Sequence, residues 1–175
     1  MADDLKTELR ALTDAEEWEL ALAMIVQRSA EVDANPRLHW DWGWTLFKLK
    51  RLDEAASHLE LASRIQPVDP VSLWGLAVVQ RELKRDVDAE MNFRRALGEK
   101  DSYLARLGLA SMYLEQGRLT DAEAVYREGV RLQPSHRERL EAFVDFLDDT
   151  GRAKEADDLR HQAARLHTRE QRRAR

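Results

Sequence analysis

The sequence predicts an all-α protein built from tandem helical hairpins, and its length, composition and repeats carry this prediction. A chain of 175 residues can bury a sizeable core. Ala, Leu, Glu and Arg are abundant, whereas only 7 Gly and 4 Pro occur, so helices are favoured. Alanines also recur every 33 or 34 residues, at Ala55, Ala89, Ala122 and Ala156. A period of this size is typical of stacked supersecondary units.

The elements are expected in the following order along the chain. Residues 1–35 should form an N-terminal helical hairpin or a degenerate repeat, and residues 15–32 within them have the spacing of one amphipathic helix. Four helix-turn-helix repeats should follow at residues 36–69, 70–102, 103–136 and 137–169. Residues 170–175 are expected to form a basic C-terminal tail.

The second half of each repeat has a common pattern. RLDEAASHLELASRIQP, which begins at Arg51, and GRLTDAEAVYREGVRLQP, which begins at Gly117, share a turn, an alanine, a large residue four positions later and a final proline. Weaker copies begin at Lys84 and Gly151. In three of the four copies, the first half of the repeat carries a small residue at the same position: Gly43, Ala77 and Ala110. Small residues on facing helices let two antiparallel helices approach closely while large residues fill the gaps.

Together these positions resemble the tetratricopeptide repeat over roughly residues 36–169. The first copy matches it at Trp42, Gly43, Leu46, Ala55, Leu59, Ala62 and Pro67, and the third at Leu109, Ala110, Tyr113, Ala122, Tyr126, Gly129 and Pro134. The resemblance implies a right-handed superhelical solenoid of antiparallel helix pairs, with a concave groove that binds peptides of partner proteins. His39 and Arg106 depart from the pattern in slots that are usually apolar or aromatic, and Gln80 replaces a bulky residue.

Three of the five tryptophans lie in one short stretch, WDWGW, which spans residues 40–44. Its alternation alone would suit a strand, but the repeat places it in a helix. At about 100° per residue, Trp40 and Trp44 share one helical face and Trp42 points nearly the opposite way. Trp42 is therefore expected in the hairpin core, and the other two tryptophans outside it.

The inner helix faces turned away from the hairpin cores are expected to line the groove. Their character changes along the chain from aromatic through aliphatic to acidic. The expected peptide groove comprises Arg37, Trp40, Trp44, Phe47, Trp74, Val78, Arg81, Leu107, Ser111, Leu114, Glu138, Glu141, Asp145 and Asp148. Aromatic side chains are common anchors of binding hot spots. The sequence therefore predicts a protein–protein interaction module or scaffold that holds an aromatic-anchored peptide, with any basic end of that peptide toward the fourth copy.

Other arrangements could also cover Trp40 and Trp44. The N-terminal helices could fold over both rings and make them part of the core. A second copy of the chain could meet the same patch in a self-associating homodimer. The acidic row of the fourth copy also has several interpretations: a solvated surface, a site for Arg or Lys of a ligand, or a contact for the chain's own basic C-terminal residues.

Composition and motifs speak against several other functions. The net charge is −5, and residues 160–175 hold six Arg against one Glu, so the preceding body is strongly acidic and RNA binding is a distant third alternative. The chain lacks cysteine, and its five histidines have no metal-ligand spacing. No nucleotide-binding or catalytic motif occurs, so neither an enzyme nor a cofactor is expected. No leader or membrane span is apparent, which favours a cytoplasmic location.

Overall fold

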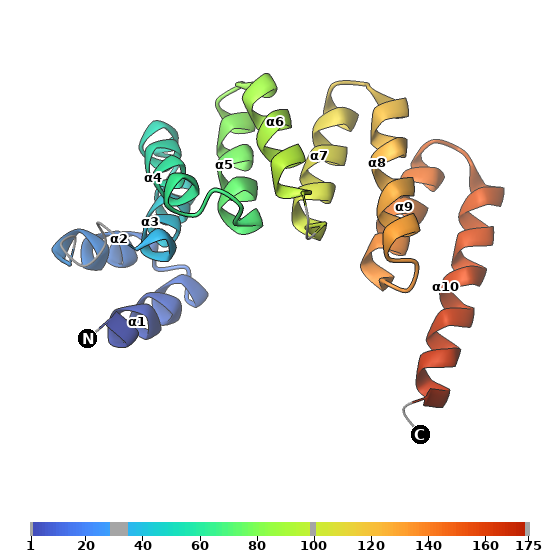
Figure 1. Ribbon diagram of the computed structural model, residues 1–175, viewed down its shortest axis with the longest axis horizontal. Coiled ribbons are helices and arrows are strands. Elements are labelled where there is room, and N and C mark those ends of the chain that lie inside the picture. The colour runs from blue at the N-terminus through green and yellow to red at the C-terminus, as the bar shows by residue number, and fades with distance from the viewer. Residues whose placement is uncertain (1, 29–34, 99–100, 174–175) are drawn as a thin grey trace. The chain divides into compact units, whose positions relative to one another are not determined.

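The computed structural model describes residues 2–28, 35–98 and 101–173, and these residues contain helices and no strands (Figure 1). The all-α prediction is therefore confirmed. The helices form two compact units, Met1–Ser102 and Tyr103–Arg175. The helices are α1 (Ala2–Asp14), α2 (Trp18–Gln27), α3 (Pro36–Lys48), α4 (Leu52–Ile65), α5 (Pro70–Glu82) and α6 (Asp86–Ala96) in the first unit, and α7 (Tyr103–Glu115), α8 (Leu119–Leu132), α9 (Arg137–Asp149) and α10 (Ala153–Arg173) in the second.

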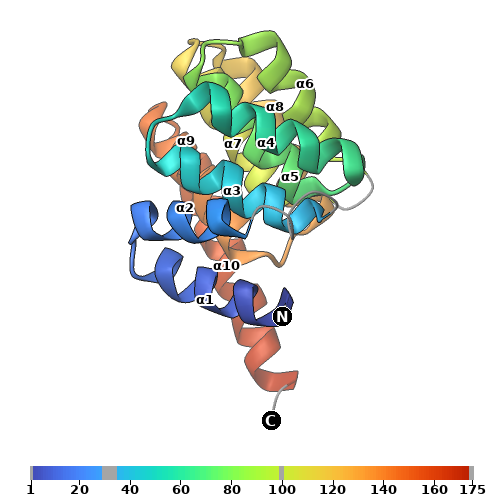
Figure 2. The same ribbon diagram turned by 90° about the vertical axis from the view of Figure 1, so that its left-hand side faces the viewer.

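Successive helices form antiparallel pairs within each unit (Figures 1 and 2). In the first unit α1 pairs with α2, α3 with α4 and α5 with α6, and in the second α7 pairs with α8 and α9 with α10. The inner helices α3, α5, α7 and α9 begin at residues 36, 70, 103 and 137. The basic residues expected as a separate tail from residue 170 begin inside α10, which continues to Arg173. Glu, Gln and Arg all favour helix, so this stretch gives the helix no reason to end earlier.

The turn inside each repeat closes in the same way. The second residue after the first helix has a positive φ of 61–74° in all four copies, at Lys50, Lys84, Gly117 and Gly151. The next residue is always an arginine, and its amide donates to the carbonyl five positions earlier over 2.8–2.9 Å. This geometry is a Schellman helix end, which satisfies carbonyls that the helix leaves unpaired. The same backbone hydrogen bonds therefore close the turn in every copy, although the residue with positive φ is a lysine in two copies and a glycine in the other two.

The arginine after each turn also ties helices together. Its guanidinium contacts a carboxylate three residues later in three copies, for example Arg51 with Glu54 at 2.7 Å. Contacts to the preceding hairpin follow in each unit: Arg85 lies 3.3 Å from Asp53, and Arg152 lies 2.7 Å from Glu123. The hydrogen bond from Arg152 lowers the pKa of Glu123. Each such surface pair contributes at most about 1 kcal/mol, so the pairs orient the hairpins more than they stabilise them.

Small residues bring the two helices of each hairpin together. The four alanines of the repeat are fully buried. At Gly43 of α3 an added Cβ would lie 2.6 Å from Leu59 Cγ and 3.0 Å from the Ala55 carbonyl oxygen of α4, so only glycine fits there. The large residues Leu46, Leu59 and Leu76 fill the space around these contacts. This alternation of small and large residues is the packing that the sequence predicts.

The residues that depart from the repeat pattern are buried and matched by a neighbour. His39 stacks on His58, with 3.2 Å between their Nδ1 atoms. The Gln80 carbonyl oxygen accepts a hydrogen bond from the Asn92 amide at 2.8 Å.

The third residue that departs from the repeat pattern, Arg106, lies against a glycine on the facing helix, Gly129. Arg106 donates to the Val125 carbonyl oxygen at 3.0 Å, and its Cδ lies 2.5 Å from where a Cβ on Gly129 would stand. Gly129 occupies the slot of a larger residue in the repeat, so the space it leaves accommodates the arginine. Each polar substitution therefore has a compensating partner on the facing helix, as buried polar groups require.

We predict that the His39–His58 contact makes the first unit sensitive to acid. Burial, and then the nearby His39, lowers the pKa of His58 below its usual value of 6.5. The unfolded chain therefore takes up this proton more readily than the folded chain, and stability falls as the pH drops below about 6.5. His58→Gln removes the titrating group but keeps hydrogen-bonding atoms. Thermal unfolding at pH 7.5 and 5.5 should show a smaller loss of Tm in the variant, and equal losses would contradict the prediction.

We also predict that Gly129 and Arg106 are energetically coupled. Gly129→Ala should be less favourable in the wild-type chain than in an Arg106→Ala background by at least about 1 kcal/mol, because alanine has no Cδ or Nε against the added methyl. Urea unfolding of the wild type, both single variants and the double variant measures this difference directly. Equal effects of Gly129→Ala in both backgrounds would show that the close approach carries no energy.

Candidate functional site

In the first unit, the inner helices α3 and α5 each begin with a proline that directly follows the helix-capping residue. The Asn35 side chain accepts a hydrogen bond from the Arg37 amide at 3.0 Å, and the Asp69 carboxylate accepts one from the Ser72 amide at 2.8 Å. A proline follows each capping residue, and its fixed φ suits the first helical position. These caps set where α3 and α5 start, and hence which side chains share a face.

An aromatic cluster extends over the inner faces of α3 and α5. The Trp40 and Trp44 rings stack with 5.5 Å between centroids and an interplanar angle of 9°. Trp44 also contacts Phe47 at 5.0 Å and Trp74 at 5.1 Å. Trp42 lies on the other side of α3 and stacks on His58 at 4.0 Å. The helical phase inferred from WDWGW is therefore confirmed. We call Trp40, Trp44, Phe47 and Trp74 the aromatic cluster; all four are partly buried.

Trp40 serves both the core and the surface. Its Nε1 donates to the Val71 carbonyl oxygen at 3.3 Å, and its ring packs against the hydrophobic core around Leu46 and Leu59. Gly75 of α5 makes this possible, because a Cβ at that position would lie 3.0 Å from Trp40 Nε1. The ring nevertheless keeps partial exposure. Trp40 thus packs against the core and also stays partly exposed.

The N-terminal helices form the other wall of an opening beside these rings. Leu5 and Leu9 of α1 pack with Ala21 and Ile25 of α2 and with Leu38 of α3, which holds α1 and α2 against α3 (Figure 2). A pocket of about 430 Å³ remains between them. We call it the indole pocket; its lining residues are Leu9, Arg10, Thr13, Asp14, Trp18, Arg37, Trp40, Asp41 and Trp44. The N-terminal helices therefore line the exposed indoles without enclosing them fully.

Charged pairs surround the indole pocket. The Arg37 guanidinium reaches Asp41 with nitrogen–oxygen distances of 3.2 and 3.4 Å and lies 4.8 Å from the Trp40 ring centroid. Arg10 and Asp14 are 3.8 Å apart at the rim. A mixture of indole faces and carboxylates can hold a polar or cationic side chain as well as an apolar one.

Sequence reasoning missed one wall of this pocket. Arg10, Asp14 and Trp18 were not expected at the site, because the register of the N-terminal helices could not be read. Asp41 was also missed, although it lies one helical turn after Arg37, the spacing of a helical ion pair. A tryptophan flanked by charged residues, as Trp18 is in EEWEL, was the available signal.

The remaining expected groove residues lie on both units. Val78 and Arg81 are partly buried on α5, the helix that also carries Trp74 of the aromatic cluster. Leu107, Ser111 and Leu114 are partly buried on α7, and the four acidic residues are exposed on α9.

The acidic row on α9 has basic neighbours within the second unit. Arg137 lies 3.1 Å from Glu141, and His136 lies 3.1 Å from Glu138. Arg160, the first of the basic C-terminal residues, contacts Asp148. The two arginines offset part of the row's charge. Of the sequence alternatives, the contact with the chain's own basic residues is thus present at one position.

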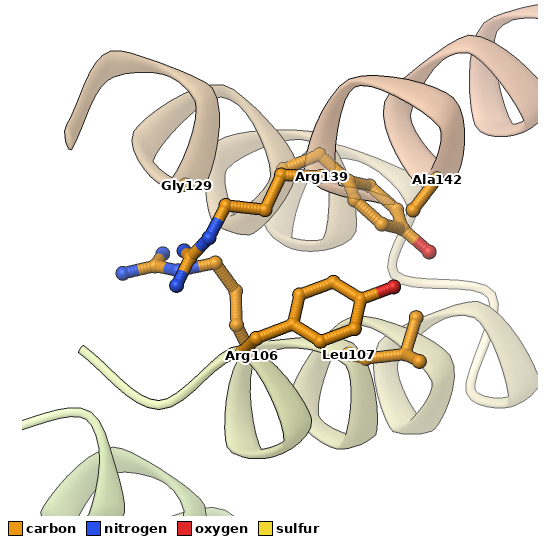
Figure 3. A pocket seen from close by; sticks show the side chains of 7 residues that line it. Arg106, Leu107, Gly129, Arg139 and Ala142 are labelled. Carbon is orange, nitrogen blue, oxygen red and sulfur yellow. The ribbon is translucent and has the colours of Figure 1, made fainter. Parts of the chain in front are cut away.

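A small cavity in the second unit is a packing feature. Figure 3 shows the Arg106 and Arg139 side chains beside each other at its wall. Leu107, Gly129, Ala142, Tyr103 and Tyr126 complete the lining. Its volume of about 10 Å³ can hold no more than roughly one water molecule. Burial raises the pKa of both tyrosines, so their phenols stay neutral.

The described residues hold neither a metal-binding cluster nor a helix suited to span a membrane. In residues 2–28, 35–98 and 101–173, no group of three or more His, Asp or Glu side chains is arranged to hold a metal ion. No helix in these ranges combines the length and apolar character that crossing a bilayer requires.

Part of the chain matches a known repeat family, and a longer stretch resembles one curated protein. Residues 88–137 match the tetratricopeptide repeat family model. A 91-residue stretch, or 51% of the chain, is 34% identical to the human protein O-mannosyl-transferase TMTC1. The chain spans only about 10% of that protein's length.

Solved structures share the fold at low sequence identity. MamA from Desulfovibrio magneticus RS-1 superposes with a TM-score of 0.68 at 14% identity, over 95% of both chains. A thermophilic tetratricopeptide repeat protein from Thermus thermophilus gives 0.70 at 22% identity, over 79% of this chain and 77% of that one. YrrB, another tetratricopeptide repeat protein, gives 0.58 at 18% identity, over 90% and 82%. Residues 88–137 therefore carry a tetratricopeptide repeat, and the chain shares the all-α fold of solved tetratricopeptide repeat proteins.

Proposed function

We propose that the chain is a protein–protein interaction module that binds a peptide of a partner protein at the indole pocket and the aromatic cluster. The observation that carries this proposal is the group of partly exposed indoles, Trp18, Trp40 and Trp44, around one opening of about 430 Å³. Grouped aromatic rings that stay in contact with water mark interaction sites, and tryptophan is among the commonest hot-spot residues. The pocket is also large enough for one or two side chains.

The comparisons support an interaction role in general terms. The tetratricopeptide repeat fold is typically a non-catalytic interaction module, and YrrB is described as having an unusual peptide-binding site. For the present chain we propose that the partner peptide extends from the aromatic cluster along Val78 and Arg81 of α5. The acidic residues of α9 would favour a basic segment in the same partner.

We predict that Trp44→Ala weakens peptide binding by about 30-fold, which corresponds to about 2 kcal/mol for a hot-spot residue. Trp44 is central because it contacts Trp40, Phe47 and Trp74 at once. Peptides selected from a displayed random library against the full chain supply the ligands, and calorimetry measures Kd. Circular dichroism and Tm confirm that the variant remains folded.

Val87→Ala is the matched control, because Val87 is 83% exposed on α6 and lies outside the pocket and the cluster. It should change Kd by less than about twofold. Unchanged binding by Trp44→Ala would refute the proposed site. Light scattering tests the alternative of self-association: a wild-type particle of twice the chain mass that dissociates on Trp40→Asp would make this surface a homodimer contact instead.

A further inference from the structure

The rings of the indole pocket already bind two cations of the chain itself. The Arg37 guanidinium lies over Trp40 and pairs with the Asp41 carboxylate. The Lys48 ammonium lies over Trp18 with 5.2 Å to the ring centroid. An indole face combined with a nearby carboxylate is thus a working cation site in this unit, since one wall of the pocket holds a guanidinium in this way.

The rest of the pocket offers the same two groups a second time. Trp44 of α3 and Asp14 of α1 both line it. Within the described ranges, the cations found over the pocket's three indoles are Arg37 and Lys48, and neither lies over Trp44. Asp14 has a loose partner: Arg10 is 3.8 Å away, and the two side chains are 74% and 83% exposed. A pair this exposed contributes little, so another cation can replace Arg10 at small cost.

The charge of the first unit favours a cationic ligand. The sequence of residues 1–102 contains 20 Asp and Glu against 14 Lys and Arg, a net charge of −6. Such a field attracts a positively charged ligand before contact and disfavours a carboxylate. Guanidinium suits the pocket better than ammonium, because its planar group stacks on an indole face and can pair with a carboxylate at its edge.

We propose that the indole pocket takes an arginine side chain of the partner peptide, with its guanidinium on Trp44 and against Asp14. This inference rests on the proposed function, and it names the chemistry of the anchoring residue. Arg37 shows the same mode of binding within the chain and leaves room for a second guanidinium, since the pocket has about 430 Å³ beside it.

The test uses three blocked probes, Ac-Gly-Gly-Xaa-Gly-Gly-NH2, in which Xaa is arginine, its neutral isostere citrulline, or phenylalanine. Nuclear magnetic resonance of the full chain follows the indole N–H signals of Trp18, Trp40 and Trp44 during titration at low salt. The arginine probe should shift the Trp44 signal and bind about tenfold more tightly than the citrulline probe, because only arginine gains cation–π and ionic contacts.

Matched variants separate the pocket from the general charge of the unit. Asp14→Asn should weaken binding of the arginine probe about fivefold, whereas Asp88→Asn, an equal change of charge at an exposed position of α6, should alter it less than about twofold. Asp14 ends α1, where a negative charge is not stabilising, so its neutralisation should leave the fold intact. Equal binding of arginine and citrulline, or tightest binding of phenylalanine at the same indoles, overturns the arginine anchor and leaves the proposed peptide function standing. If no probe shifts any indole signal, both the anchor and the pocket's role in peptide binding are wrong.

Discussion

The distance between the two helices of each hairpin is the constraint on which the rest of the structure depends. Backbone approach at Gly43 and at the buried alanines is closer than any larger side chain permits. Leu46 and Leu59 then fill the remaining space, and the apolar flank of each pair is covered by the next. This close approach also determines helical phase, because the small residues must face the partner helix. Once Gly43 faces α4, Trp42 turns toward His58, and Trp40 and Trp44 turn away from it.

Three polar residues in the core show that a hairpin accepts a polar side chain where the facing helix offers a complement. A histidine, a glutamine and an arginine occupy positions that the repeat normally fills with apolar groups, yet each has a complement on the facing helix. His39 meets His58, Gln80 meets Asn92, and Arg106 extends over Gly129. A buried polar group without such a partner would cost roughly 1–3 kcal/mol. The side-chain chemistry of these three positions therefore changes while each polar group keeps a complement on the facing helix.

The candidate site arises where this regular packing stops. The helices before the first full repeat contact α3 through Leu5, Leu9, Ile25 and Leu38, but they leave a space beside Trp40 and Trp44. Trp40 is tied to α5 by its hydrogen bond to Val71, which fixes one ring, and Trp44 stacks on it. These contacts hold the partly exposed indoles next to carboxylates, and such preorganisation would reduce the entropy lost on binding the proposed peptide. The site is therefore a product of an incomplete N-terminal stack.

The sequence by itself determined the helical class, the repeat period, the buried alanines and the phase of the three clustered tryptophans. These features follow from local periodicity, since a helix turns by a constant angle per residue and each repeat carries the same small residues. It did not reveal the wall made by Arg10, Asp14 and Trp18, because no repeat pattern relates α1 and α2 to the hairpins that follow. Nor did it show that Lys48 lies on the Trp18 ring, or that Arg160 contacts Asp148. Contacts between residues distant in sequence depend on how helices dock, and only the tertiary structure decided those.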